Sequence, residues 1–412
     1  MTDAAVPPNG PAEAITGPLS DIRVLDIATF IAAPFCGTLL ADFGADVLKI
    51  EQPEGGDTLR RFGTLVPGAD TLVWASEARN KRSMTLDLRR DEGREIFLSL
   101  VSRSHVVLEN FRPGTLEKWG LGFEEIRAVN PRIVMLRVSG YGQTGPMRGK
   151  PGFARIAHAF GGLSHLAGEA DGRPVVPGST SLADYMTGLF GAVGVLVALR
   201  HAERSGEGQE IDIALYESVF RVLDEIAPAY ARSGFERSRL GPDTVNAAPH
   251  SHYRTQDGEW VAIACTTDRM WINLARAIGP ESLTSDARFA TGQLRDGLRT
   301  ELNAIVGRWT EARTVAQVLD ACAQHDVPAS KLMSIGDIFA DPQFAARGNL
   351  RTIADERFGE LTLPGPLPSL SRTPAQLRSV GPALGESTDH ILSDLLGHTA
   401  AEIVRLRTNG II

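Results

Sequence analysis

A short apolar strand, a helix and a second apolar strand follow one another near the start of the chain. Residues 22–27 (IRVLDI) and 47–50 (VLKI) have the length and the branched apolar side chains of buried strands. Between them, Pro34 suits the first turn of a helix and Gly44 its C-terminal end. Parallel strands need a crossover of this kind, so the unit predicts a parallel sheet.

The same alternation continues through the first half of the chain. We predict further strands at 83–88, 105–109, 132–138 and 209–215, and helices at 91–102, 115–119, 181–204 and 216–230. Alternating strands and helices are typical of doubly wound folds. The sequence therefore predicts an α/β, Rossmann-like large domain with an open parallel sheet.

The sequence changes character after Arg232. Residues 233–249 are rich in Gly, Pro, Asn and Arg, which is typical of a loop or linker. Asp257-Gly258 between two strand-like runs predicts a hairpin, and helical patterns follow it. We predict a mobile tail at 1–18, a large domain beginning at 19–232, a smaller α+β domain at 233–334, and a return segment at 335–412 that completes the large domain.

Charge and cysteine content exclude several classes of protein. The net charge is −8, with 42 Lys and Arg against 50 Asp and Glu, whereas nucleic-acid binders need a basic face. The three cysteines are widely spaced and form no CxxC pair, which fits a reducing compartment such as the cytoplasm. The longest apolar stretch, 188–199, is shorter than the ~20 residues that span a bilayer. The sequence thus predicts a cytoplasmic protein that binds neither nucleic acid nor membrane.

Gly140, Gly142 and Gly145 form a GxGxxG pattern after a predicted strand. In dinucleotide-binding folds these glycines open a helix, but here Pro146 and further Gly and Pro residues follow. The context favours a glycine-rich loop and leaves an NAD-type oxidoreductase as the weaker alternative. No established metal-binding motif is found in the sequence. The close pair His250 and His252 is only a weak indication of a metal site.

Two basic runs stand out in this acidic chain, Arg60-Arg61 and residues 79–82 (RNKR). Solvated surface charge is the usual explanation of such runs. Cations at the ends of α/β strands are also what a phosphate-rich ligand requires, so both interpretations stay open.

Six stretches of the chain, in order and covering nearly its whole length, resemble one known family. They are 24–57 (VLDIATF…PEGGD), 80–89 (NKRSMTLDLR), 108–121 (LENFRPGTLEKWGL), 130–146 (NPRIVMLRVSGYGQTGP), 183–218 (ADYMTGLFG…ALYES) and 384–397 (LGESTDHILSDLLG). The family is the class III (CaiB/BaiF) CoA-transferases. Within it, the motif sequences most resemble those of the succinyl-CoA:dicarboxylate CoA-transferases.

The resemblance implies transfer of CoA from an acyl-CoA, such as succinyl-CoA, to a free carboxylic acid through an aspartyl-CoA thioester. It places the nucleophile at Asp184 and implies an interlocked homodimer. CoA thioesters would be substrates, with no permanently bound cofactor. The CoA contacts that it implies are Ile31, Ala32, Gln52, Leu86, Arg89, Asn110, Phe111, Lys118 and Lys150. Some transferases have Arg where this chain has Gln52 and Lys118.

Asp184 also has a structural interpretation. Ser181-x-x-Asp184 before an apolar helix matches a capping box, in which the side chains bond to helix N–H groups. The two roles are compatible, because a carboxylate beside helix N–H groups stays ionised and can act as a nucleophile.

A 2-methylacyl-CoA racemase is the nearest alternative within the resemblance. Racemases pair the acidic residue with a histidine that transfers the α-proton, and this chain has Phe153 at the corresponding place. For a dicarboxylate substrate, the second carboxylate would need a cation, for which Arg61, Arg148 and His252 are the candidates.

Overall fold

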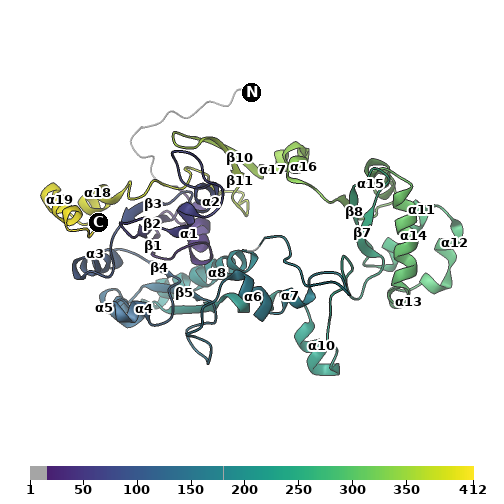
Figure 1. The fold of residues 1–412 in the computed structure, drawn as a ribbon, viewed down its shortest axis with the longest axis horizontal. Helices are drawn as coiled ribbons and strands as arrows, with labels where there is room; N and C mark the ends of the chain where they lie inside the picture. Colours follow the sequence, from purple (N-terminus) through teal and green to yellow (C-terminus); the bar gives the residue numbers. More distant parts are fainter. Residues whose placement is uncertain (1–15, 180) are drawn as a thin grey trace. The chain divides into compact units, whose positions relative to one another are not determined.

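Six parallel strands form a sheet in the order β3-β2-β1-β4-β5-β6 (Figure 1). The structure is a computed structural model and describes residues 16–179 and 181–412. The strands are β1 (Arg23–Asp26), β2 (Asp46–Glu51), β3 (Arg82–Thr85), β4 (Val106–Glu109), β5 (Val134–Ser139) and β6 (Glu210–Ala214). The predicted α/β class with an open parallel sheet is confirmed. Its strand order reverses between β1 and β4, where open sheets usually bind their ligands.

Side chains that alternate along the strands fill two cores, one on each face of the sheet. Val24 and Val106 pack on the face covered by α1 (Ala32–Asp42) and α8 (Leu182–Ser205), which lie side by side (Figure 1). Leu25 and Val107 point to the other face, which is covered by α3 (Asp91–Val101), α5 (Phe123–Val129) and α19 (Ala400–Thr408). Because both faces are covered, the central strands are apolar throughout, as in other parallel sheets.

The sheet and its helices belong to a compact unit of residues 16–163, 176–179, 181–225 and 345–412. Its helices are α1 (Ala32–Asp42), α2 (Leu72–Glu77), α3 (Asp91–Val101), α4 (Thr115–Lys118), α5 (Phe123–Val129), α6 (Ala154–Phe160), α8 (Leu182–Ser205), α9 (Leu215–Arg221), α18 (Thr388–His390) and α19 (Ala400–Thr408). Shorter turns are η1 (Thr58–Arg61) and η3 (Ile391–Leu395), and β10 (Leu350–Asp355) pairs with β11 (Gly359–Pro364).

Residues 164–175 and 226–344 form a second, smaller compact unit. Its elements are α10 (Ile226–Ser233), β7 (His250–Arg254), β8 (Trp260–Ala264), α11 (Asp268–Ile278), α12 (Glu281–Ser285), η2 (Ala287–Phe289), α13 (Gly292–Gly297), α14 (Arg299–Glu311), α15 (Val315–Gln324), β9 (Ala329–Lys331) and α16 (Ile335–Ala340). Two short helices, α7 (Leu163–Leu166) and α17 (Pro342–Arg347), lie at the boundaries of the units. The hairpin predicted at Asp257-Gly258 is confirmed as β7–β8. A compact unit is not necessarily a part that folds on its own, so the predicted domain bounds stay predictions.

One expectation about a helix is wrong. The helix predicted over 216–230 is interrupted after Arg221, and Asp224 has a left-handed backbone with φ of 50°, which no α-helix can accommodate. Among the described residues, one helix, α8, is long and apolar enough to cross a membrane by length and composition alone. Its residues Ala192 and Val195 are buried in the core beside α1, as in a core helix. The predicted tail at 1–18 lies outside the described residues except for its last three.

Candidate active site

The turn after β1 lies where the strand order of the sheet reverses. Thr29 donates its backbone N–H to Asn110 Oδ1 at 2.8 Å, and Asn110 Nδ2 donates to Thr29 O at 2.7 Å. Because Asn110 directly follows β4, these two bonds join the carboxyl ends of neighbouring strands. Ligands of open α/β sheets bind in the crevice at this position.

Phe30, the next residue of the turn, has a left-handed backbone with φ of 63°. A bulky residue in this conformation costs about 1–3 kcal/mol, so its surroundings must hold it there. The N–H of Phe30 donates to Asp57 Oδ1 at 3.0 Å, and Lys49 Nζ lies 2.9 Å from Asp57 Oδ2. These buried charges fix the turn immediately before Ile31 and Ala32.

The residues expected to contact CoA follow the carboxyl ends of β1 to β5 along the chain. Four of them gather around the turn after β1 and the end of β4: Ile31, Ala32, Asn110 and Phe111. Gln52 follows β2, Leu86 and Arg89 follow β3, and Lys150 follows β5, while Lys118 is the last residue of α4. The placement is compatible with one extended ligand along this edge, and the individual contacts stay predictions.

The cations in this set differ in how they are paired. Arg89 is exposed, but its Nε lies 2.8 Å from Asp87 Oδ1, which neutralises part of its charge. Lys118 and Lys150 are also exposed, and neither forms an ion pair within the part of the chain that the structure describes. The two lysines therefore offer unpaired positive charge to a phosphate group.

Asp184 lies in the first turn of α8, the helix that packs along α1. Gly188 follows one turn later on the same face, where an added β-carbon would lie only 2.7 Å from Ala32 O. Tyr185 packs edge-on against Phe35, with ring centroids 4.9 Å apart. These contacts place Asp184 at the N-terminal end of α1, beside the turn that follows β1.

The capping box predicted at the start of α8 is wrong. The Ser181 side chain makes no capping bond, and its N–H donates to Ser179 Oγ at 3.1 Å. The N–H of Ala183 donates instead to Nε2 of His158, on α6, at 3.0 Å. The Asp184 carboxyl forms no hydrogen bond or ion pair with any residue that the structure describes. This carboxyl is therefore not kept ionised by helix N–H groups, and burial raises its pKa to about 7.

Most cations of the two basic runs are unavailable to a ligand. Arg60, Arg79 and Lys81 are nearly fully buried and form ion pairs with carboxylates at 2.6–2.9 Å. For these three residues, both the surface interpretation and the phosphate interpretation are wrong. Arg61 stays exposed and donates to the carbonyl oxygen of Gly55.

A buried charge cluster behind the turn was missed by the sequence analysis. Asp26, the last residue of β1, lies 2.9 Å from Lys81 Nζ and 3.5 Å from Lys49 Nζ. Lys49 also pairs with Asp57, and all four side chains are at most 1% exposed. The signals in the sequence were charged residues inside apolar strands, Asp26 in IRVLDI and Lys49 in VLKI.

The three candidates for a second carboxylate lie on different elements. Arg61 and Arg148 are exposed in the larger unit, at the end of η1 and in the loop after β5. His252 is exposed on β7 of the smaller unit. Phe153 lies in the larger unit, with its ring centroid 6.5 Å from that of Phe30, so an aromatic ring lies beside the turn where racemases would have histidine.

The glycine-rich segment after β5 forms a loop, as predicted. No helix begins until Ala154, and a β-carbon added to Gly140 would lie 2.7 Å from Gly152 Cα. The glycines thus permit a close approach of two backbones, which gives no support to dinucleotide binding.

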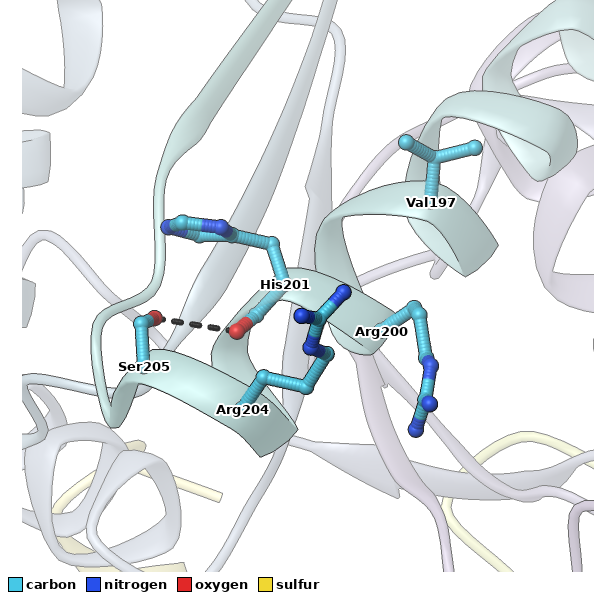
Figure 2. Close-up of a pocket in the computed structure, with 5 residues that line it drawn as sticks. All are labelled: Val197, Arg200, His201, Arg204 and Ser205. Carbon is cyan, nitrogen blue, oxygen red and sulfur yellow. Dashed lines mark hydrogen bonds between the residues drawn. The ribbon is translucent and has the colours of Figure 1, made fainter.

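A cavity of about 490 Å³ lies near the C-terminal end of α8. Figure 2 shows its lining residues. They are Val197, Arg200, His201, Arg204 and Ser205. All five residues come from one helix, several turns beyond Asp184, so this cavity is separate from the site at the start of α8.

Comparison with known proteins shows what the whole chain is similar to. A family model described as CoA-transferase family III matches residues 19–388. The beta subunit of succinyl-CoA–L-malate CoA-transferase from Chloroflexus aurantiacus is 53% identical over 96% of this chain and 98% of that protein. Succinyl-CoA–D-citramalate CoA-transferase from the same organism is 42% identical over 96% and 98%. The crystal structure of a CaiB/BaiF family protein from Brucella suis superposes with a TM-score of 0.81, at 35% identity over 92% of this chain and 99% of that one.

Proposed function

Because the chain belongs to CoA-transferase family III, we propose that it transfers CoA from succinyl-CoA to a short dicarboxylic acid through Asp184. The observation that carries this proposal is the Asp184 carboxyl, which lies beside the turn after β1 and has no hydrogen-bond partner among the described residues. The names of the two Chloroflexus proteins support succinyl-CoA as the donor and a dicarboxylate as the acceptor.

In the first half of the reaction, an ionised oxygen of Asp184 attacks the thioester carbonyl of succinyl-CoA. The C–S bond breaks, leaving a mixed anhydride and CoA thiolate. The thiolate then attacks the aspartyl carbonyl, which releases succinate and forms an aspartyl-CoA thioester. The acceptor carboxylate attacks that thioester, and the same two steps in reverse give the new acyl-CoA and free Asp184.

No step of this sequence needs an external energy source, because the thioester bond of the donor is exchanged for that of the product. We therefore propose that no permanently bound cofactor takes part and that CoA thioesters enter as substrates. The enzyme would act in the cytoplasm, where such thioesters are made. Chelation of metal ions should leave the exchange rate unchanged, and a loss restored by zinc or magnesium would contradict this.

A panel of acids tests the proposed function. Purified protein is incubated with succinyl-CoA and one acid at a time, and new CoA thioesters are identified by mass spectrometry. L-malate, citramalate and other short dicarboxylic acids should be converted, while monocarboxylic acids of equal length serve as controls. Formation of no new thioester from any dicarboxylic acid would overturn the proposal.

The second carboxylate of the acceptor needs a cation, and we propose Arg61, Arg148 and His252 for this role. Glutamine at the responsible position should raise the KM for a dicarboxylic acid but not for its monocarboxylic control. Equal changes for both acids would exclude that residue.

The pKa of Asp184 predicts how the first half-reaction depends on pH. Only the ionised carboxylate attacks, so adduct formation from saturating succinyl-CoA should rise with pH and level off with a midpoint at about pH 7. Single-turnover measurements without acceptor test this directly. A midpoint at about pH 4, the ordinary value for aspartate, would contradict the effect of burial.

Lys118 should contribute to CoA binding and not to acceptor binding. Lys118→Ala removes an unpaired exposed charge, and the KM for succinyl-CoA should rise by about tenfold, equivalent to ~1.4 kcal/mol. Arg127→Ala on α5, which also removes an exposed cation, is the matched control and should leave this KM unchanged. A change confined to the KM of the acceptor would show that the assignment is wrong.

We also propose that the enzyme is a homodimer in which a second copy covers α8. Five large apolar side chains on this helix are 38–66% exposed: Leu189, Phe190, Val193, Leu196 and Val197. Such a contiguous apolar face typically marks an interface. Val193→Asp should shift the protein towards monomer in size-exclusion chromatography with light scattering. The equally exposed but isolated Val404→Asp on α19 should not, and a wild-type monomer would refute the proposal.

A further inference from the structure

His158 occupies an unusual position for a histidine. It is fully buried on α6, and its Nε2 accepts the N–H of Ala183 in the first turn of α8. A nitrogen that accepts cannot carry a proton, so the neutral ring carries its proton on Nδ1. Nδ1 has no hydrogen-bond partner among the described residues.

This arrangement has a cost. A buried N–H without a partner destabilises a protein, and an apolar side chain of similar size would avoid that loss. The imidazole supplies an acceptor for the N–H of Ala183, which the side chain of the N-cap residue Ser181 leaves unsatisfied. Burial and the nearby Arg155 lower the pKa of His158, which keeps the ring in the neutral form that can accept.

Ala183 directly precedes Asp184, and side chains bind both its backbone N–H and its backbone carbonyl. Its N–H is bound by His158, and its carbonyl oxygen accepts from Thr187 Oγ1 at 2.7 Å. Thr187 Oγ1 in turn lies 3.0 Å from the buried hydroxyl of Ser218. The backbone that carries Asp184 is therefore fixed by side chains of α6, α8 and α9.

An acidic residue at the third position of a helix commonly turns back to bond the N–H of the N-cap residue. At the start of α8, Ser179 binds the N–H of Ser181, and His158 binds that of Ala183. Ser179 thus makes the bond to the N-cap N–H that Asp184 would make in a capping box, and His158 binds the N–H of the second helical residue, so the carboxyl of Asp184 caps neither group.

We propose that His158 is a positioning residue, which binds the N–H of Ala183 and so holds the first turn of α8 with the Asp184 carboxyl free to attack the thioester. The inference rests on the proposed role of Asp184 as the nucleophile. Without the imidazole, the N–H of Ala183 would lack its partner, and the neighbouring Asp184 side chain would turn towards it.

Three substitutions separate this role from simple packing. His158→Phe keeps a ring but removes the acceptor, whereas His158→Gln keeps an acceptor oxygen. His158→Leu provides a second variant without an acceptor. For each protein, single-turnover formation of the Asp184 adduct from saturating succinyl-CoA is measured against pH, together with the Kd for CoA and the Tm.

In His158→Phe and His158→Leu we expect adduct formation to slow by about tenfold or more, with an unchanged Kd for CoA. The midpoint of the pH profile should also fall below that of the wild type, because helix N–H groups would then stabilise ionised Asp184. Tyr185 beside Asp184 and Arg155 beside His158 are the same in every variant, so they do not account for such a shift. His158→Gln should restore most of the rate and the wild-type profile.

A wild-type rate and pH profile in both variants without an acceptor would overturn the inference. It would also be overturned if His158→Gln were equally impaired, or if the lost activity only followed the lost folded fraction given by Tm. If the wild type itself forms no adduct at Asp184, the proposed function fails, and that result is distinguishable because it needs no His158 variant.

Discussion

Asp184→Asn should lower the rate of CoA transfer by at least about three orders of magnitude while the protein stays folded and still binds CoA. The amide keeps the shape of the carboxyl but has no anionic oxygen to attack the thioester. Incubating the wild type with succinyl-CoA and then with hydroxylamine or borohydride should modify the peptide that contains Asp184. Exchange at the wild-type rate in the variant, or a label on another peptide, would refute the mechanism.

The same variant should also be more stable than the wild type at alkaline pH. Burial raises the pKa of Asp184 to about 7, so the protonated form is favoured by folding. Its contribution to stability is complete below about pH 4 and is lost as the pH rises through about 7. Asparagine never ionises, so at pH 8 the free energy of unfolding should rise by on the order of 1 kcal/mol. A capping role for Asp184 would give the opposite result, earlier melting of the variant.

Asp26→Asn should destabilise the protein by about 3–5 kcal/mol. The substitution leaves the ammonium group of Lys81 without its carboxylate and removes one of the two partners of Lys49, and both lysines are at most 1% exposed. A buried charge that loses its partner cannot be rehydrated without opening the core. Urea unfolding followed by circular dichroism would measure the loss.

Asp91→Asn is the matched control for Asp26→Asn. Asp91 pairs with Arg94 on the surface of α3, where the carboxylate is 87% exposed, so its loss should cost less than about 1 kcal/mol. Equal stability of Asp26→Asn and the wild type would show that the buried cluster contributes little to folding.

The parts of the fold that follow from local patterns could be predicted from the sequence. The βαβ unit at 22–50 and the hairpin at Asp257-Gly258 are both set by the spacing of apolar and turn residues within a short segment. The break after Arg221 was missed because the apolar pattern of 216–230 was followed alone, although Pro228 within it cannot donate a helix hydrogen bond. The left-handed backbone at Asp224 gives no signal in the apolar pattern.

The candidate site was predicted less completely, because it depends on contacts between distant segments. Asp184 and the CoA contacts came from the resemblance to a family, which carries no information about partners. His158 lies 25 residues before the N–H that it binds, and Lys81 lies 55 residues from Asp26. The sequence shows the charge of such residues, but only the packed structure shows which of them remain available to a ligand.

Position 188 of this enzyme tolerates no side chain larger than that of glycine without a change in helix packing. A single methyl group at this position would meet the carbonyl oxygen of Ala32 at 2.7 Å, so α8 and α1 could keep their spacing only by bending or moving apart. Either adjustment would carry the first turn of α8, and the carboxyl on it, away from the turn after β1. Random mutagenesis aimed at a new acceptor acid should therefore leave codon 188 fixed and vary the exposed positions around it.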